Sequence, residues 1–84
     1  MFYVYVLQSL KDQKLYTGYT SDINKRFQEH NLGEVPSTKN RKPFKLIYFE
    51  FCLNQVDAIH RERYLKTTYG KRYLKNRLKN FHLE

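Results

Sequence analysis

The sequence predicts an α+β fold in which strand-like and helix-like segments follow one another along 84 residues. Three segments are rich in aromatic and β-branched residues, as strands are, and three others have the apolar spacing of amphipathic helices. Turn and capping residues separate these segments. A chain of this length has room for one small core, so we expect a single domain over residues 1–84.

The first predicted strand is the segment 2–7, FYVYVL. Because side chains alternate along a strand, its two faces carry different sets, with Phe2, Val4 and Val6 on one and Tyr3, Tyr5 and Leu7 on the other. Both sets are apolar or aromatic. We therefore expect other parts of the chain to cover both faces of this strand.

The second predicted strand, 15–19, pairs antiparallel with the first, because the polar residues between them can turn the chain into a hairpin. Two registers remain open. A loop centred on residues 10 and 11 places Tyr5 opposite Tyr16, whereas a loop centred on residues 12 and 13 places Tyr5 opposite Thr20.

The third predicted strand, Phe44–Leu53, is almost continuously apolar, since only Lys45 and Glu50 interrupt it. We expect it to be central in the sheet or covered on both faces. The residues before it, 33–43, contain two prolines and show no periodic pattern. A loop of that length is long for a compact domain, so we expect it to contact substrate.

Capping residues mark the predicted helices. The first opens at Ser21 or Asp22 and ends near residues 31–33, where Asn and Gly stop helices. The second starts after Asn54, and its inward stripe consists of Ala58, Glu62, Leu65 and Tyr69. Gly70 ends this helix or starts the next, which covers 71–81 with inward residues Leu74, Leu78 and Phe81.

The charge is strongly basic, with sixteen Lys and Arg against eight Asp and Glu, a formal net charge of +8. Half of the cations lie between residues 61 and 79, where Glu62 is the only acid. This balance favours a polyanionic partner, namely nucleic acid, over a merely solvated cationic surface. The predicted contacts are Lys39, Arg41, Lys42, Lys71, Arg72 and Lys75.

The sequence argues against a disulfide-stabilised or membrane protein. Cys52 is the only cysteine, which fits a reducing compartment. The first residues are not a basic leader followed by an apolar stretch, and no stretch is long enough to cross a bilayer. We expect a cytoplasmic protein with no membrane partner. His60 and His82 have no partner at metal-ligand spacing, and we interpret both as surface residues.

Polar residues interrupt faces that should be apolar, and together they suit phosphodiester chemistry. Arg26 and His30 lie on the same helix side as Ile23 and Phe27, and Glu62 lies on the next inward stripe. Arg26 can hold a phosphate, and Glu62 can anchor a hard cation such as Mg²⁺. The candidates for moving protons are Tyr5, Tyr16 and His30. A phenol needs a nearby cation to act as a base at neutral pH.

Each of these residues also has a structural interpretation. Arg26 and Glu62 could form an ion pair between two helices. His30 could simply interact favourably, as a basic group, with the C-terminal end of its helix. Gly18 could simply make it easier for the chain to leave the strand. The two tyrosines could be packing residues.

The ordered set resembles the GIY-YIG nuclease superfamily over essentially the whole chain. Tyr3-Val4-Tyr5 is similar to its first motif and Tyr16-Thr17-Gly18 to its second, with Tyr3 replacing the leading Gly and Thr17 replacing the middle Ile. The later positions match at Arg26 and His30, then at Ala58, Glu62, Leu65 and Lys66. Asn76 is the nearest candidate for an asparagine that often follows the glutamate.

This resemblance implies a three-stranded antiparallel sheet flanked by about three helices. It also implies hydrolysis of DNA with one divalent cation, Mg²⁺ or Mn²⁺, bound by Glu62. Arg26 would steady the scissile phosphate, Tyr5 and Tyr16 would position or deprotonate water, and His30 would assist. In larger relatives, which include repair nucleases, added domains choose the target, and we expect none here.

We therefore expect an endonuclease with limited sequence preference, because one small domain offers little surface for reading bases. The rival interpretation is a nucleic-acid-binding module of the same fold that cuts weakly or not at all. A purely structural basic protein ranks last, since it has no use for Glu62 on an inward stripe. The sequence leaves the oligomeric state open.

Overall fold

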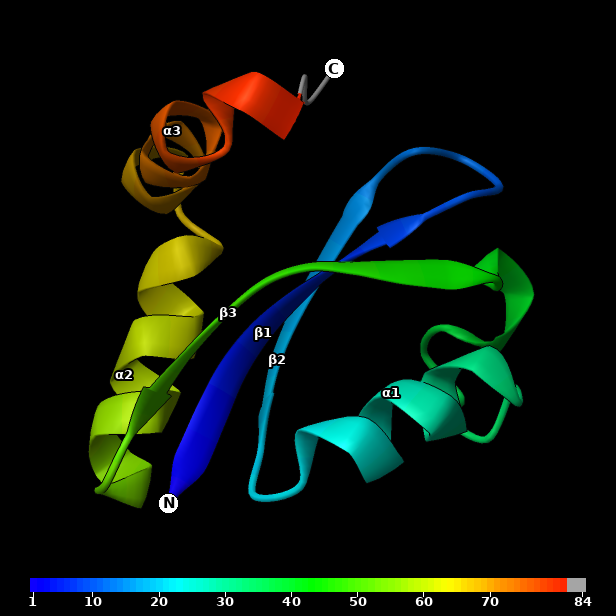
Figure 1. The fold of residues 1–84 in the computed structure, drawn as a ribbon, viewed down its shortest axis with the longest axis horizontal. Coiled ribbons are helices and arrows are strands. Elements are labelled where there is room, and N and C mark those ends of the chain that lie inside the picture. Colours follow the sequence, from blue (N-terminus) through cyan, green and yellow to red (C-terminus); the bar gives the residue numbers. More distant parts are fainter. Residues whose placement is uncertain (82–84) are drawn as a thin grey trace.

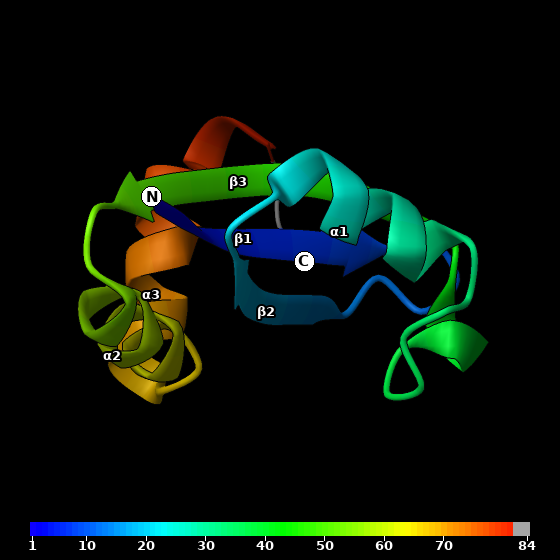
Figure 2. The same ribbon diagram turned by 90° about the horizontal axis from the view of Figure 1, so that it is seen from below.

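The computed structural model describes residues 1–81 and confirms the α+β prediction. The elements are β1 (Phe2–Ser9), β2 (Leu15–Thr20), α1 (Ile23–Asn31), β3 (Phe44–Cys52), α2 (Gln55–Leu65) and α3 (Thr68–Arg77), with short 3₁₀ helices at Lys39–Arg41 and Lys79–Phe81. The strands form an antiparallel sheet in the order β2-β1-β3. Figure 1 shows α2 and α3 on one side of the sheet and α1 on the other, and Figure 2 shows the same arrangement from below.

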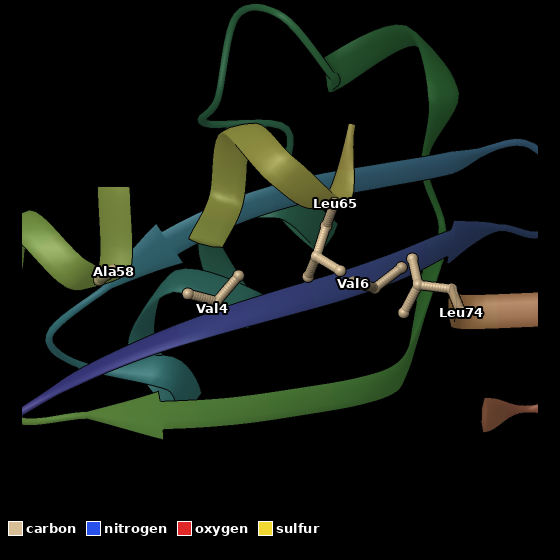
Figure 3. Packing of buried hydrophobic residues seen from close by; sticks show 5 residues of the cluster. All are labelled: Val4, Val6, Ala58, Leu65 and Leu74. Carbon is tan, nitrogen blue, oxygen red and sulfur yellow. The ribbon is translucent and has the colours of Figure 1, made fainter. Parts of the chain in front are cut away.

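The central strand β1 divides the core into two clusters, as its alternating pattern predicts. Val4 and Val6 pack against α2 and α3, in a cluster completed by Ala58, Leu65 and Leu74 (Figure 3). On the opposite face the cluster consists of Tyr5, Leu7 and Phe44, packed against Tyr16, Ile23, Phe27 and Leu46. Covering of both faces explains why every residue of this strand from Val4 to Ser9 is buried.

Both predicted hairpin registers are wrong, because the loop is centred between residues 11 and 12. Tyr5 lies opposite Gly18, and Tyr16 lies opposite Leu7. The turn closes where the amide of Ser9 donates to the carbonyl of Lys14 at 3.0 Å. The Ser9 hydroxyl also accepts from the amides of residues 11 and 12, at 3.1 and 3.2 Å. These hydrogen bonds stabilise a turn that lies between the two predicted turn positions.

The prediction that the third strand is central or covered on both faces is wrong. β3 is an edge strand, and α1 covers only its first half, where Phe44 is buried and Leu46 is partly buried. Phe49 and Phe51 remain 51% and 60% exposed. The long apolar run therefore does not reflect burial alone.

The start and end of α1 follow the capping prediction. The Asp22 side chain accepts a hydrogen bond from the amide of Lys25 at 3.1 Å and thereby caps the first turn. The helix ends at Asn31, and Gly33 follows with a φ of 77°. Glycine adopts this left-handed conformation without a steric penalty.

The boundary between α2 and α3 differs from the prediction. Asn54 caps α2 as expected, but the helix ends at Leu65, and Thr67 caps the next one. Tyr69, which was predicted on the inward stripe of the preceding helix, therefore lies on α3 and is 68% exposed. Gly70 is buried in the first turn of α3, where a Cβ would lie 2.1 Å from a backbone oxygen of α2. The absence of a side chain lets α3 start directly against the end of α2.

The rest of the C-terminal segment follows the predicted pattern in part. Leu74 is buried, and Leu78 packs against the same cluster. Phe81 lies in the second 3₁₀ helix rather than on α3. His60 is exposed, as expected, and His82 lies outside the described residues. Among the described helices, none has the length and apolar character needed to cross a membrane.

Candidate active site

A buried hydrogen bond between Tyr5 and His30 forms the centre of the candidate site. The Tyr5 hydroxyl lies 2.8 Å from Nε2 of His30, and the two residues are 2% and 0% exposed. Tyr5 reaches His30 across Gly18, its partner on β2. A Cβ at Gly18 would lie 2.6 Å from the Tyr5 hydroxyl, so glycine provides the space for this contact.

His30 makes a second hydrogen bond that sequence reasoning missed. Its Nδ1 lies 2.8 Å from Oγ1 of Thr38, which is fully buried, and that hydroxyl lies 3.5 Å from the carbonyl oxygen of Val35. Every proton has an acceptor if Tyr5 donates to Nε2, Nδ1 donates to Thr38, and Thr38 donates to Val35. We assign this tautomer from the network.

The loop 33–43 therefore has a structural part as well as an exposed one. Val35 and Thr38 are buried, and Thr38 supports His30 from behind. No sequence signal singles out Thr38, because one threonine in an aperiodic loop resembles any other. The prediction that this loop contacts substrate can hold only for its exposed residues, such as Lys39 and Lys42.

Burial keeps both members of the central pair neutral. It raises the pKa of Tyr5 to about 12, and the neighbouring acidic groups of Tyr16 and Glu62 act in the same direction, while the nearby Arg26 opposes the shift. Burial, with a contribution from the charge of Arg26, lowers the pKa of His30 to about 4, against the opposing effect of Glu29. The interpretation of His30 as a cation at a helix C-terminus is therefore wrong.

Tyr16 completes a cluster of three rings. Its ring centroid lies 5.0 Å from that of His30 and 6.4 Å from that of Tyr5. Unlike the other two rings, it is only half-buried. Tyr16 is therefore the member of the cluster that solvent reaches most easily.

Arg26 lies beside this cluster at the surface. Its side chain is 37% exposed, and its NH1 donates to a carboxylate oxygen of Glu29, one turn further along α1, at 3.1 Å. Its charge is close enough to influence the pKa values of both Tyr5 and His30. A planar guanidinium in this position can bind a phosphate whose neighbouring atoms contact the rings.

Glu62 lies on α2, outside the hydrogen-bonded cluster. Its side chain is 17% exposed, and its carboxylate accepts from Nζ of Lys66 at 2.6 Å. Because Arg26 and Glu62 each pair within their own helix, the interpretation of these two as an interhelical ion pair is wrong. Asn76 lies exposed on α3.

The donor set fits a weakly held metal ion better than an all-protein cage. Within residues 1–81 there is no group of three or more His, Cys, Asp or Glu side chains able to hold a metal. The ammonium of Lys66 shows that the Glu62 carboxylate accommodates a cation. Mg²⁺ commonly binds through one or two carboxylates and takes its remaining ligands from water and phosphate.

The predicted nucleic-acid contacts fall into two groups. Lys71 and Lys75 line a pocket of about 690 Å³ between the β1–β2 turn and α3, together with Lys14 and Lys66. The guanidinium of Arg72 packs over the exposed ring of Tyr69 on the same helix. In the other group, Lys39 and Lys42 are exposed, whereas Arg41 is engaged with Asp12 at 3.1 Å.

Comparison with known proteins identifies the family of the chain. A family model described as the GIY-YIG catalytic domain matches residues 1–79. A UPF0213 protein of Clostridium perfringens is 48% identical over 67 residues, which are 79% of this chain and 71% of that protein. One from Staphylococcus saprophyticus is 40% identical over 74 residues, covering 87% and 89% of the two chains.

A solved structure is also similar. The solution NMR structure of a UPF0213 protein from Bacillus halodurans superposes with a TM-score of 0.55 and 32% identity, over 90% of this chain and 84% of that one. The chain therefore belongs to the GIY-YIG family, within the GIY-YIG nuclease superfamily, and groups with its short UPF0213 members.

Proposed function

We propose that the protein is an endonuclease that hydrolyses DNA phosphodiester bonds with little sequence preference. The observation that carries this proposal is the buried Tyr5–His30 hydrogen bond beside an accessible Arg26. A hydrogen-bonded phenol and imidazole beside a guanidinium contribute little to the stability of a core, whereas phosphate hydrolysis uses all three groups. The family assignment points in the same direction.

Arg26 binds the scissile phosphate in this proposal. Its present partner, Glu29, lies one turn further along the same helix, and pairs of this spacing contribute only about 0.2–0.5 kcal/mol. A phosphate can therefore replace the carboxylate at little cost. The resulting bidentate contact would orient the phosphorus toward the ring cluster.

The two tyrosines take different roles. With a pKa of about 12, Tyr5 is a phenol at neutral pH, and we assign it to orienting the attacking water rather than to removing its proton. Tyr16, which is half-buried and adjacent to His30, positions the same water from the solvent side, and the proton of that water leaves to the surrounding solvent. His30 holds Tyr5 in place through Nε2.

Glu62 would hold one divalent cation, Mg²⁺ or Mn²⁺, in exchange for the ammonium of Lys66. When bound, such an ion neutralises charge on phosphate oxygens and assists the leaving oxygen. The exposed cations Lys39, Lys42, Lys71, Arg72 and Lys75 would hold the DNA backbone, so that affinity falls steeply with salt. The free thiol of Cys52 fits a reducing compartment, and we place the protein in the cytoplasm.

The test is cleavage of supercoiled plasmid, branched DNA and single-stranded DNA with Mg²⁺, Mn²⁺ or a chelator. We expect metal-dependent cutting by the wild type and a loss of about 100-fold or more in Glu62→Gln and in Arg26→Ala, the size typical of removing one electrostatic contact to the transition state. Glu34→Gln and Lys25→Ala change exposed charges elsewhere and serve as matched controls. Full activity in Glu62→Gln would refute the assignment.

Two observations favour a second candidate, a binding module that does not cut. Tyr5 is held as a neutral phenol, and Glu62 is paired with Lys66. This candidate predicts salt-sensitive DNA binding that is equal with Mg²⁺ and with chelator, and no nicking of any of the three substrates. The same assay therefore separates the two functions.

A further inference from the structure

Three aromatic side chains form an uncovered surface on the sheet, which we call the aromatic platform: Tyr3 of β1 with Phe49 and Phe51 of β3. The ring of Tyr3 lies 6.0 Å from that of Phe49 and 6.3 Å from that of Phe51, centroid to centroid. The two phenylalanine side chains are 51% and 60% exposed. Proteins that bind single-stranded nucleic acid combine exposed aromatic side chains with a positively charged surface in this way.

The platform continues directly from the candidate active site. Phe49 is the cross-strand partner of Tyr5, and Tyr3 precedes Tyr5 by two residues on the same face of β1. The first half of β3 on this face is covered by α1, through Phe44 and Leu46. The second half is left open, immediately beside the rings that contact His30.

The exposed area is suited to bases rather than to a second protein. A fully covered aromatic side chain buries about 150–250 Å², so the open parts of Phe49 and Phe51 amount to roughly 200 Å². A stable protein interface buries about 800 Å² on each partner. The net charge of +8 also opposes association of two copies and attracts nucleic acid.

We propose that the aromatic platform stacks unpaired nucleobases of the DNA strand whose phosphate is held at Arg26. This inference rests on the proposed function and names its substrate class. In a duplex each base is stacked on both sides, so its face is not available to Phe49 or Phe51, whereas single-stranded and frayed DNA offers free faces. The protein therefore prefers single-stranded DNA, or duplex DNA with unpaired residues, over continuous duplex.

The experiment uses a single-stranded oligonucleotide that carries the fluorescent base aminopurine, with chelator present to prevent cutting. Stacking quenches aminopurine, so we expect saturable quenching with the wild type. Phe49→Leu and Phe51→Leu keep the apolar bulk but remove the aromatic face, and each should weaken binding about tenfold. Phe51→Tyr restores an aromatic face and should bind like the wild type. Leu32→Ala, at an apolar side chain that is 67% exposed elsewhere, is the matched control.

Binding of a duplex of the same sequence should be unchanged in the Leu variants, and thermal unfolding of each variant checks that it is folded. Equal affinity of the wild type and the Phe49→Leu/Phe51→Leu double variant for the single strand would overturn the proposal. So would a stable wild-type dimer, seen by sedimentation, that the double variant loses, because the platform would then be an interface between two copies of the chain. Quenching without cleavage in Mg²⁺ would refute the proposed nuclease activity but support the platform as a base-binding surface. Cleavage without quenching would support the nuclease activity but refute the platform proposal.

Discussion

The stability of the protein should fall steeply between pH 6.5 and pH 4 because of one buried side chain. The pKa of His30 is lowered from 6.5 to about 4, first by burial and then by Arg26. Between these values the unfolded chain binds a proton that the folded protein excludes, so stability is lost as the pH falls through this window. At 1.36 kcal/mol per pKa unit the full loss is about 3 kcal/mol, of which about 2 kcal/mol has gone by pH 5.

Urea unfolding at several pH values measures this loss. The protein also loses stability as the carboxylates of Glu50 and Asp12 become protonated below about pH 4.5. Hydrogen bonds to charged and polar neighbours lower the pKa values of these two groups. The variant His30→Gln keeps those groups, so the difference between its pH profile and that of the wild type isolates His30. The variant His60→Gln replaces an exposed histidine and is the matched control.

NMR titration of the imidazole carbons tests the same reasoning without unfolding. The His30 signal should titrate near pH 4, or vanish as the protein unfolds first. A midpoint at 6.5 or above would show that the ring is hydrated or paired with an anion, and would refute the neutral Tyr5–His30 pair on which the proposed roles depend. A pH profile of His30→Gln parallel to that of the wild type would refute it as well.

Two further predictions concern the contacts that hold this pair. Gly18→Ala places a methyl group 2.6 Å from the Tyr5 hydroxyl, so it should push the phenol away from His30. We expect urea unfolding to show a loss of stability of about 1–3 kcal/mol, and the NMR signals of His30 to shift. An unchanged spectrum would show that the space at Gly18 is not needed. Thr38→Val leaves Nδ1 of His30 without its acceptor and should lower the free energy of unfolding by about 1–3 kcal/mol, whereas Thr38→Ser keeps the hydroxyl and should lower it less. Nitrogen chemical shifts of the imidazole report whether the tautomer has changed. Equal losses of stability in the two variants would contradict the role of the hydroxyl.

Features that depend on a few neighbouring residues could be predicted from the sequence. The alternating faces of β1 follow from its period of two, and the starts of α1 and α2 follow from Asp22 and Asn54. The hairpin register could not be predicted in the same way, because the Ser9 hydroxyl sets it through contacts that a hydrophobic pattern does not record.

Long-range features were harder to predict. Thr38 contacts His30 across a loop with no periodic pattern, and only the folded chain brings the two together. β3 was interpreted as central because an apolar run usually means burial. Here the run extends onto an exposed edge, where Phe49 and Phe51 continue the face that contains Tyr5. The failure of the burial rule at this edge is the physical reason for suspecting a binding surface there.

The site divides into a rigid interior and a replaceable exterior, and this division follows from burial. Tyr5, His30 and Thr38 are buried with every polar group paired, so moving any of them leaves an unsatisfied donor or acceptor. Arg26 and Glu62 instead pair with Glu29 and Lys66, which lie three and four residues further along the chain, and the side chains of these two pairs are between 17% and 52% exposed. Such pairs contribute little to stability, so a phosphate and a divalent cation can displace the present partners without disturbing the fold. Substitutions at Arg26 and Glu62 should therefore separate chemistry from folding, whereas substitutions in the interior change both.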